Sequence, residues 1–268
     1  MSEELETNAD KILAEAMRMS EKIEADIAQN PKKYRVLTGD RPTGRLHIGH
    51  YFGSLKNRVR LSKLGVPTMI LIADYQVLTD HDAFDKISEN TKELVIDYLA
   101  AGIEPGENVC IYPHSHVPEA NQLMVPFLTL VTKSDLDRNP TVKDEMAKSS
   151  IPLNAGMYTY PVHQAVDILF CKGNVVPVGK DQLPHLEIAR QIARRFNNKF
   201  CKGIDPIFPE PHALLSKTPM IMGLDGSAKM SKSLGNTIML SATDDETAKA
   251  IKKAKTDQDR HITYDPVN

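Results

Sequence analysis

The sequence predicts an α/β fold in which helices cover both faces of a parallel sheet, a doubly wound arrangement. Short segments rich in branched apolar residues alternate with longer segments whose apolar residues recur at helical spacing. Residues 68–73 are apolar on both faces, which is typical of an interior strand of a parallel sheet. Strands alternating with helices at this spacing indicate right-handed βαβ crossovers. With 268 residues, 41% of them apolar, the chain is long enough for one large domain or two small ones.

The order of the elements follows from the same patterns. Residues 1–31 predict an amphipathic helical appendage that ends at Asn30 and Pro31, and residues 32–268 predict the sheet domain. We expect strands at 34–38, 68–73, 109–112, 174–178 and 219–222, and helices from near His47 into the early 60s, at 83–101, from about 118, at 160–170 and at 181–196. The apolar segment 123–131 fits either a subunit interface or a buried helix.

Composition narrows the class of protein without naming a function. The net charge of −2 gives no uniform attraction to nucleic acid, so contact with RNA requires a local basic patch. A helix with Arg190, Arg194, Arg195 and Lys199 offers such a patch, although a charged helix face is usually only solvated. Three separated cysteines lack the spacing of a zinc or redox site and predict reduced thiols in a cytoplasmic protein; we expect neither a leader peptide nor a membrane span.

His47, Gly49 and His50 form the first motif with chemical content. The two histidines are three residues apart at the start of a predicted helix, so they share one face of its first turn. Gly49 lets a ligand approach the backbone closely, and a helix N-terminus offers free N–H groups to phosphate. An isolated pair of this kind more often caps and packs a helix, so the motif alone does not decide between these roles.

The second motif consists of residues 229–233, Lys-Met-Ser-Lys-Ser, in a loop rich in glycine and serine. Lys229 and Lys232 are three residues apart, and two ammonium groups on a movable loop can close over a phosphate leaving group. The glycine patterns of P-loop and dinucleotide-binding proteins do not occur in the sequence.

The two motifs, in this order, resemble the signatures of the class I aminoacyl-tRNA synthetases, and residues 38–55 match that class throughout. Within it the chain is most similar to the tryptophanyl-tRNA synthetase family, from Tyr34 to its last residue and most specifically over 158–169 and 176–185. The resemblance implies a Rossmann-type fold and ATP-dependent activation of L-tryptophan, followed by transfer to tRNA(Trp). It also implies a homodimer, with Mg²⁺ carried by the ATP.

The resemblance assigns roles to particular residues. The implied catalytic residues are His47, His50, Lys229 and Lys232. The implied ATP-binding residues are Gly39, Arg41, Pro42, Thr43, Gly49, His50, Gly179, Lys180, Asp181, Ile221, Lys229, Met230, Ser231, Lys232 and Ser233. The implied tryptophan-binding residues are Asp167, Tyr160, Gln164, Val176, Val178 and Gln182. Asp167 matches a carboxylate that accepts the indole N–H, a group that phenylalanine lacks. Lys143 and Lys148 both match a further lysine that some relatives place near ATP.

The sequence fits three alternative functions, and it departs from the family pattern at its C-terminal end. The tyrosine-specific sister family shares both signatures and also uses a helix aspartate. Small-molecule nucleotidyltransferases use the histidine motif without the lysine loop, and a synthetase-derived module without catalysis is a third alternative. Residues 185–213 are expected to begin a C-terminal helical region, and we expect this chain to lack the remainder of the anticodon-reading helical domain found in the family.

Overall fold

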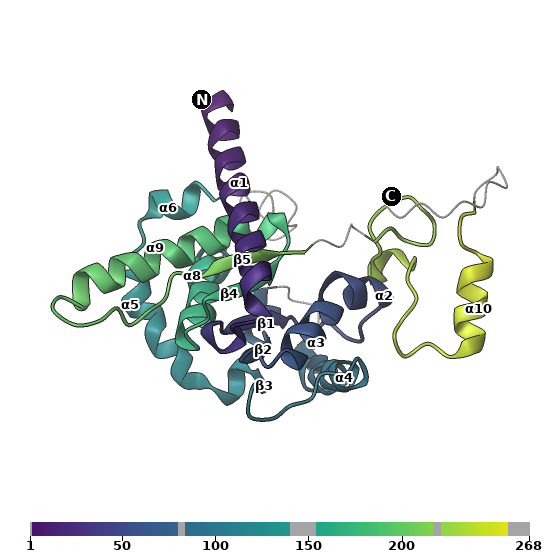
Figure 1. The fold of residues 1–268 in the computed structure, drawn as a ribbon. Coiled ribbons are helices and arrows are strands. Elements are labelled where there is room, and N and C mark those ends of the chain that lie inside the picture. Colours follow the sequence, from purple (N-terminus) through teal and green to yellow (C-terminus); the bar gives the residue numbers. More distant parts are fainter. Residues whose placement is uncertain (1, 80–83, 140–153, 217–220, 257–268) are drawn as a thin grey trace.

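A computed structural model describes residues 2–79, 84–139, 154–216 and 221–256 of the chain. Its centre is a sheet of five parallel strands in the order β3-β2-β1-β4-β5 (Figure 1). The strands are β1 (Val36–Asp40), β2 (Thr68–Ile72), β3 (Val109–Pro113), β4 (Val175–Val178) and β5 (His212–Leu215). The order reverses between β1 and β4, as expected for a doubly wound fold. The predicted fold class is therefore confirmed.

Side chains of β2 alternate between the two faces of the sheet. Ile70 and Ile72 pack into the cluster that lines one face, and Leu71 packs into the cluster that lines the other. Successive residues of a strand point to opposite faces, so an interior strand covered on both sides must be apolar throughout. The interior position predicted for this segment is confirmed, because β2 pairs with both β1 and β3.

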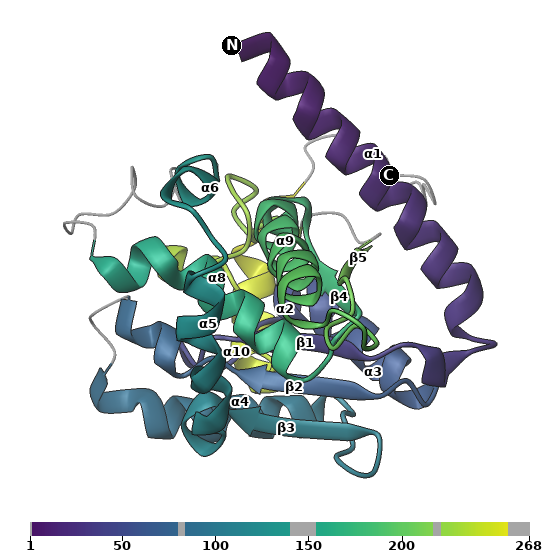
Figure 2. The ribbon, with the colours of Figure 1, turned by 90° about the vertical axis from the view of Figure 1, so that its left-hand side faces the viewer.

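Helices cover both faces of the sheet. On one face α8 (Ala155–Phe170) and α9 (Leu183–Phe200) lie side by side, with α5 (Met124–Leu128) against α8 (Figure 2). On the other face α3 (Lys56–Lys63) buries Leu61, and α4 (Ile87–Ala100) buries Leu94 and Tyr98. The helix expected after His47 is continuous from α2 (Ile48–His50) through a π-helical turn (Tyr51–Leu55) into α3. In the apolar segment 123–131, residues 124–128 form α5, in which Phe127 is fully enclosed and Val125 is 70% exposed; the subunit interface expected as an alternative stays a prediction.

The N-terminal helix α1 (Ser2–Ile27) lies along β5, the last strand of the sheet (Figure 1). Its last turns bury Ile23 and Ile27, so this half of the helix belongs to the core. The Ser20 hydroxyl accepts a hydrogen bond of 2.9 Å from the backbone N–H of Leu215. Covering an edge strand in this way removes an exposed row of backbone donors and acceptors.

Residues 185–213 differ from the helical region expected from the sequence. Residues 185–200 belong to α9, which packs on α8, and the segment then reaches β5. The sequence interpretation did not include β5, α6 (Lys133–Asp137) or α10 (Asp244–Lys252). Residues 219 and 220 of the expected strand 219–222 lie outside the described residues, as do Lys143 and Lys148; of the strand's other two residues, Met222 forms an isolated bridge with Lys229.

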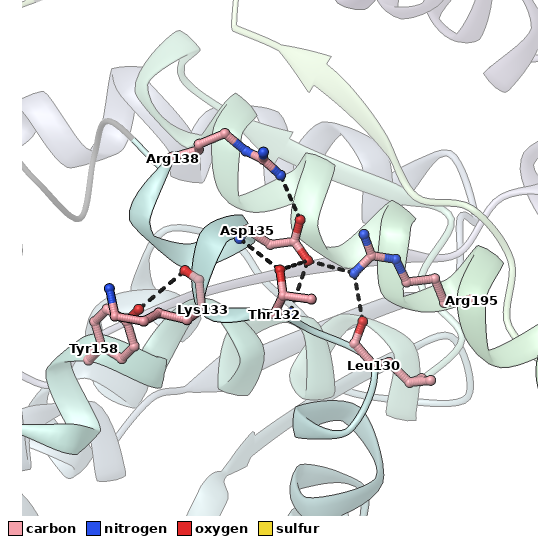
Figure 3. A network of polar contacts seen from close by, with 7 residues as sticks. All are labelled: Leu130, Thr132, Lys133, Asp135, Arg138, Tyr158 and Arg195. Carbon is pink, nitrogen blue, oxygen red and sulfur yellow. Dashed lines mark hydrogen bonds and ion pairs between the residues drawn. The ribbon is translucent and has the colours of Figure 1, made fainter.

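Arginines of α9 are held by ion pairs within the chain. Arg195 donates to Asp135 of α6 at 2.7 Å and to the carbonyl of Leu130 at 2.6 Å, and these bonds tie α6 to α9 (Figure 3). Arg190 and Arg194 both pair with Glu187. The basic helix expected from the sequence is present, but acidic partners balance much of its charge. No helix within the described ranges has the length and hydropathy needed to cross a membrane.

Candidate active site

The candidate site lies where the strand order reverses. At such a point the connections leaving two neighbouring strands turn to opposite faces and open a crevice beyond the carboxyl ends of the strands. Here β1 leads into α2 and α3 on one face, and β4 leads into α9 on the other. Gly39 lies near the end of β1 and Thr43 in the segment that follows it, and Gly179 and Gln182 lie in the segment that leaves β4.

An ion pair fixes the end of β1. The buried guanidinium of Arg58, on α3, bonds both oxygens of Asp40, at 3.1 Å for Nη2 and Oδ1, and Tyr98 donates to the same carboxylate at 2.6 Å. Burial alone raises the pKa of Asp40, but Arg58 and the two hydrogen-bond donors outweigh it and hold the pKa below its usual value. A Cβ atom on Gly39 would lie 2.3 Å from the carbonyl oxygen of Leu71, so only glycine fits here.

His47 and His50 pack against one another at the start of the helix. Their ring centroids are 3.8 Å apart, and the backbone N–H of His47 donates to Nδ1 of His50 at 3.2 Å. Because Nδ1 of His50 accepts, the proton of the neutral ring sits on Nε2. Nδ1 of His47 is buried and has no hydrogen-bond partner within the described part of the chain. Both rings therefore keep polar atoms that a ligand can engage.

Both histidines are neutral near pH 7. Burial, followed by the charges of His50, Lys232 and Lys229, lowers the pKa of His47 to about 4. Burial also lowers the pKa of His50, and the opposing effect of Asp40 does not restore it. Neutral imidazoles present N–H donors without fixed positive charge, so the cationic groups of the site are the two lysines.

Gly49 makes room for the His47 ring. A Cβ atom at this position would lie 2.9 Å from two atoms of that ring and 3.4 Å from the sulfur of Met230. The glycine predicted to let a ligand approach therefore also lets His47 fold over the helix start. Met230, from the second signature, is buried against the same point. The two signature segments thus pack together at Gly49.

Backbone hydrogen bonds join the segment that follows the lysine loop to the histidine motif. The N–H of Ile48 donates to Ile238 at 3.0 Å, and the N–H of Leu240 donates to Leu46 at 2.9 Å. The Lys232 ammonium donates to the backbone oxygen of Thr43 at 2.9 Å, which places it over the loop after β1. Burial lowers the pKa of Lys232 from its usual value. The predicted catalytic groups are thereby brought together.

A buried asparagine, Asn236, holds the lysine loop in shape. Its side-chain oxygen accepts from the backbone N–H of Ser231 at 2.8 Å, and its amide donates to Asp225 at 3.1 Å. A Cβ atom on Gly223 would lie 2.0 Å from this amide nitrogen, so the glycine creates the space that the asparagine fills. The loop closes with Gly235 at φ 63°, a left-handed conformation that suits glycine. Lys229, at the other end of the loop, pairs with Met222 in a short bridge.

The segment after β4 turns sharply across the crevice. Asp181 folds back so closely that a Cβ on Gly179 would lie 2.5 Å from its Oδ1. Gln182 donates to Asp181 at 2.9 Å and accepts from Gln164 of α8 at 3.3 Å. This chain of amides connects the predicted nucleotide side of the crevice with the predicted amino-acid pocket.

Asp167 lies in the interior beside a cluster of polar rings. Its Oδ1 is 2.9 Å from Nε2 of His114, and the ring of His114 stands 4.8 Å from that of His163. Within the described residues one group, His114, His163 and Asp167, places possible metal-ligand atoms within 4.8 Å of one another. Burial is the largest effect on His163 and lowers its pKa, so that ring is neutral at pH 7. The prediction that Asp167 is partly buried mid-helix is confirmed.

Tyr160, which like Asp167 belongs to α8, contacts His185 of α9. The amide of Asn139 donates to Nδ1 of His185 at 3.0 Å, which puts the ring proton on Nε2, 2.8 Å from the Tyr160 hydroxyl. Burial lowers the pKa of His185 to about 4, so the neutral form persists in this network. Val176 is buried in the core at the sheet surface under α8, and Val178 is half-buried beside it.

Sequence reasoning missed three residues of this region: Asp74, His114 and Asn236. Asp74 and His114 each follow a strand, β2 and β3 respectively, so the rule that parallel sheets bind ligands at their carboxyl ends points to both. No pattern in the sequence singles out Asn236, because its partners are set by the folding of the loop.

Comparisons with known proteins agree with this geometry. A family model described as "tRNA synthetases class I (W and Y)" matches residues 29–268. A tryptophan–tRNA ligase of Clostridium longisporum is 46% identical over 239 residues, covering 86% of this chain and 68% of the relative. One of Lactococcus lactis is 44% identical over 244 residues, covering 87% of this chain and 70% of the relative.

Solved structures extend the comparison. The tryptophanyl-tRNA synthetase of Campylobacter jejuni, complexed with ADP and tryptophan, matches with a TM-score of 0.75 and 36% identity over 84% of this chain and 68% of its own. The tyrosyl-tRNA synthetase of Aeropyrum pernix matches with a TM-score of 0.68 at 22% identity, over 88% of this chain and 67% of its own, which shows a common fold only. The chain belongs to the class I aminoacyl-tRNA synthetases of the tryptophan and tyrosine family.

Proposed function

We propose that the chain activates L-tryptophan with ATP to give tryptophanyl-adenylate and pyrophosphate, and then transfers the tryptophanyl group to tRNA(Trp). The observation that carries the proposal is the docking of the lysine loop beside the histidine motif, where Lys232 donates to the backbone oxygen of Thr43 in the loop after β1. Relatives named tryptophan–tRNA ligase, 44–46% identical to the chain, support tryptophan over tyrosine as the amino acid.

Activation requires positioning and charge stabilisation rather than a protein nucleophile. A carboxylate oxygen of tryptophan attacks the α-phosphorus of ATP, a new C–O–P linkage forms, and the bond from that phosphorus to the bridging oxygen of pyrophosphate breaks. Negative charge grows on the departing pyrophosphate. Donors already aimed at that position stabilise it without reorganisation.

His47, His50, Lys229 and Lys232 provide these donors. The neutral imidazoles donate from their N–H groups, and the two ammonium groups supply positive charge from the loop side. Lys232 binds a backbone oxygen of the protein itself. We propose that the phosphates of ATP replace that oxygen. We propose that Mg²⁺ enters as part of the MgATP substrate. The Asp40 carboxylate near His50 is already paired with Arg58, so it is not free to bind the ion.

The remaining predicted residues divide between nucleotide and amino acid. The phosphates of ATP are bordered by Gly39, Arg41, Pro42, Thr43 and Gly49. The ribose is bordered by Gly179, Lys180 and Asp181, and the adenine by Ile221. The lysine loop is shaped by Met230, Ser231 and Ser233. Asp167 accepts the indole N–H, and Tyr160, Gln164, Val176, Val178 and Gln182 complete the tryptophan pocket. We also propose that the active form is a homodimer in the cytoplasm, as the family resemblance implies.

A pair of lysine variants tests the proposal. Lys232→Ala should slow adenylate formation in single-turnover experiments about 100-fold, which is the usual effect of losing one transition-state donor. Tryptophan binding should change little, and the exposed Lys253→Ala should leave both unchanged. The chain contains no tryptophan, so fluorescence of the bound ligand reports binding directly. A Lys232→Ala variant that loses tryptophan binding but keeps the chemical rate would contradict the assigned role.

A further inference from the structure

The carboxylate assigned to tryptophan recognition is already hydrogen-bonded to another side chain. His114 Nε2 lies 2.9 Å from Asp167 Oδ1, and the exposed fractions of the two side chains are 3% and 4%. Within the described residues, His114 is the side chain that hydrogen-bonds to this carboxylate, and it does so through Oδ1. The second oxygen, Oδ2, is therefore left for a donor that a ligand supplies.

The ring of His114 is held in one orientation. Tyr75 stacks on it with ring centroids 5.4 Å apart and an interplanar angle of 23°. Nδ1 of His114 faces the Asp74 carboxylate at 3.6 Å, and the backbone N–H of Ser115 donates to that carboxylate at 3.3 Å. With one ring face covered and Nδ1 turned toward Asp74, Nε2 points at Asp167.

We propose that His114 is a positioning residue that selects for tryptophan by fixing the Asp167 carboxylate. The N–H at Nε2 occupies Oδ1, stops the carboxylate from rotating, and leaves Oδ2 as the acceptor for the indole N–H. This inference rests on the proposed function, because it assumes that Asp167 contacts the indole. It adds that Asp167 recognises tryptophan well only when His114 holds it.

A metal ion among His114, His163 and Asp167 is the competing interpretation. Two ligands bound tetrahedrally to one zinc ion stand about 3.3 Å apart, whereas the His114 and Asp167 atoms are at hydrogen-bond distance, 2.9 Å. Nε2 of His163 is 2.9 Å from the side-chain oxygen of Asn121 rather than bonded within the group. A metal would also take the lone pairs that the indole N–H needs. These distances favour a hydrogen bond between His114 and Asp167 over a metal ion shared by the three side chains.

The test compares tryptophan with β-(3-benzothienyl)alanine, in which sulfur replaces the indole N–H. The readout is the ratio of kcat/KM for the two substrates in ATP–pyrophosphate exchange. Wild-type protein should prefer tryptophan at least about tenfold, because a site built around a donor rejects an analogue that lacks it. His114→Asn, whose amide is too short to reach Asp167, should bring the ratio close to one. His114→Gln, whose amide N–H reaches the place of Nε2, should keep most of the preference.

Controls separate this role from a structural one. The exposed His116→Asn, in the same short 3₁₀ helix, should leave the ratio unchanged. If His114→Asn lowers kcat/KM for both substrates equally and keeps the ratio, His114 only supports the fold and the inference is wrong. If wild-type protein activates tryptophan without preferring it over the analogue, Asp167 does not recognise the indole N–H. The role of His114, which depends on that recognition, is then also wrong. Stoichiometric zinc in the purified protein that is lost in both His114→Asn and His163→Asn would also overturn it.

Discussion

Asn236 offers the sharpest test of how the lysine loop is held. Its buried side chain joins two parts of the loop, through Ser231 on one side and Asp225 on the other. Replacing it with alanine removes both hydrogen bonds and leaves the backbone N–H of Ser231 without its acceptor. Asn236 itself is not among the residues proposed to contact ATP, so any effect of its replacement on catalysis must pass through the shape of the loop.

The size of the effect follows from these two bonds. An ordinary hydrogen bond contributes about 1 kcal/mol, and an N–H left without a partner costs about 1–3 kcal/mol when buried. Ser231 is only half-buried, so we expect a total near 2 kcal/mol. If this free energy is lost from the ordered loop, adenylate formation slows by about 30-fold, at about 1.4 kcal/mol for each factor of ten.

Single-turnover formation of tryptophanyl-adenylate measures this rate, and ligand fluorescence measures tryptophan binding in parallel. Asn236→Ala should slow the rate while tryptophan binding stays within about twofold of wild type, because the loop lies on the nucleotide side. The matched control is Asn198→Ala on the exposed surface of α9, which should change neither quantity. A folded Asn236→Ala variant with a wild-type rate would refute the idea that Asn236 sets the loop geometry.

Three further predictions follow from the same geometry. Gly49→Ala places a methyl group 2.9 Å from the His47 ring, so it should destabilise the protein by about 1–3 kcal/mol in urea unfolding and slow adenylate formation; an unchanged midpoint and rate would contradict this. Arg58→Ala leaves Asp40 without its cation and should cost about 3–5 kcal/mol, read from the same curves, whereas loss of under about 1 kcal/mol would show that the pair does not anchor β1. In the folded protein the pKa of His47 and that of His185 are both about 4, below the ordinary value of 6.5. As the pH falls from 6.5 to 4, the unfolded chain therefore binds protons at these rings that the folded protein does not bind. The free energy of unfolding should therefore drop across that window, by at most about 3 kcal/mol for each ring, and His185→Gln should reduce the slope; stability that rises toward pH 5 would be inconsistent with the buried neutral histidines.

The sheet was largely predictable because its strands carry the apolar pattern that burial on two faces requires. Residues 68–73 illustrate this, since β2 is enclosed by strands on both sides and by helices above and below. The short strand β5 escaped prediction because it has four residues, begins with a histidine, and is defined by pairing with β4 rather than by its own pattern. Helix α10 has a sequence signal of its own, the capping box of Thr243 and Glu246 at its start.

The candidate site was predictable only where its residues are adjacent in sequence. His47 and His50 can be predicted from their spacing at the start of a helix, and the lysine loop can be predicted from its motif. His114 and Asp167 are 53 residues apart and meet because β3 and α8 end near each other in space. The partners of Asn236 depend on how one loop folds back on itself. Contacts of this kind come from topology, which a linear pattern does not encode.

ATP–pyrophosphate exchange with each of the twenty amino acids tests the central claim most directly. It requires no tRNA and reports only the formation and reversal of the adenylate. The account predicts exchange driven by tryptophan and by no other amino acid, with Asp167→Ala losing the preference for tryptophan over phenylalanine. Exchange driven by tyrosine would show that the chain has the tyrosine specificity found in its family instead of the tryptophan specificity. Absence of exchange in folded protein would contradict the assignment of His47, His50, Lys229 and Lys232 to catalysis.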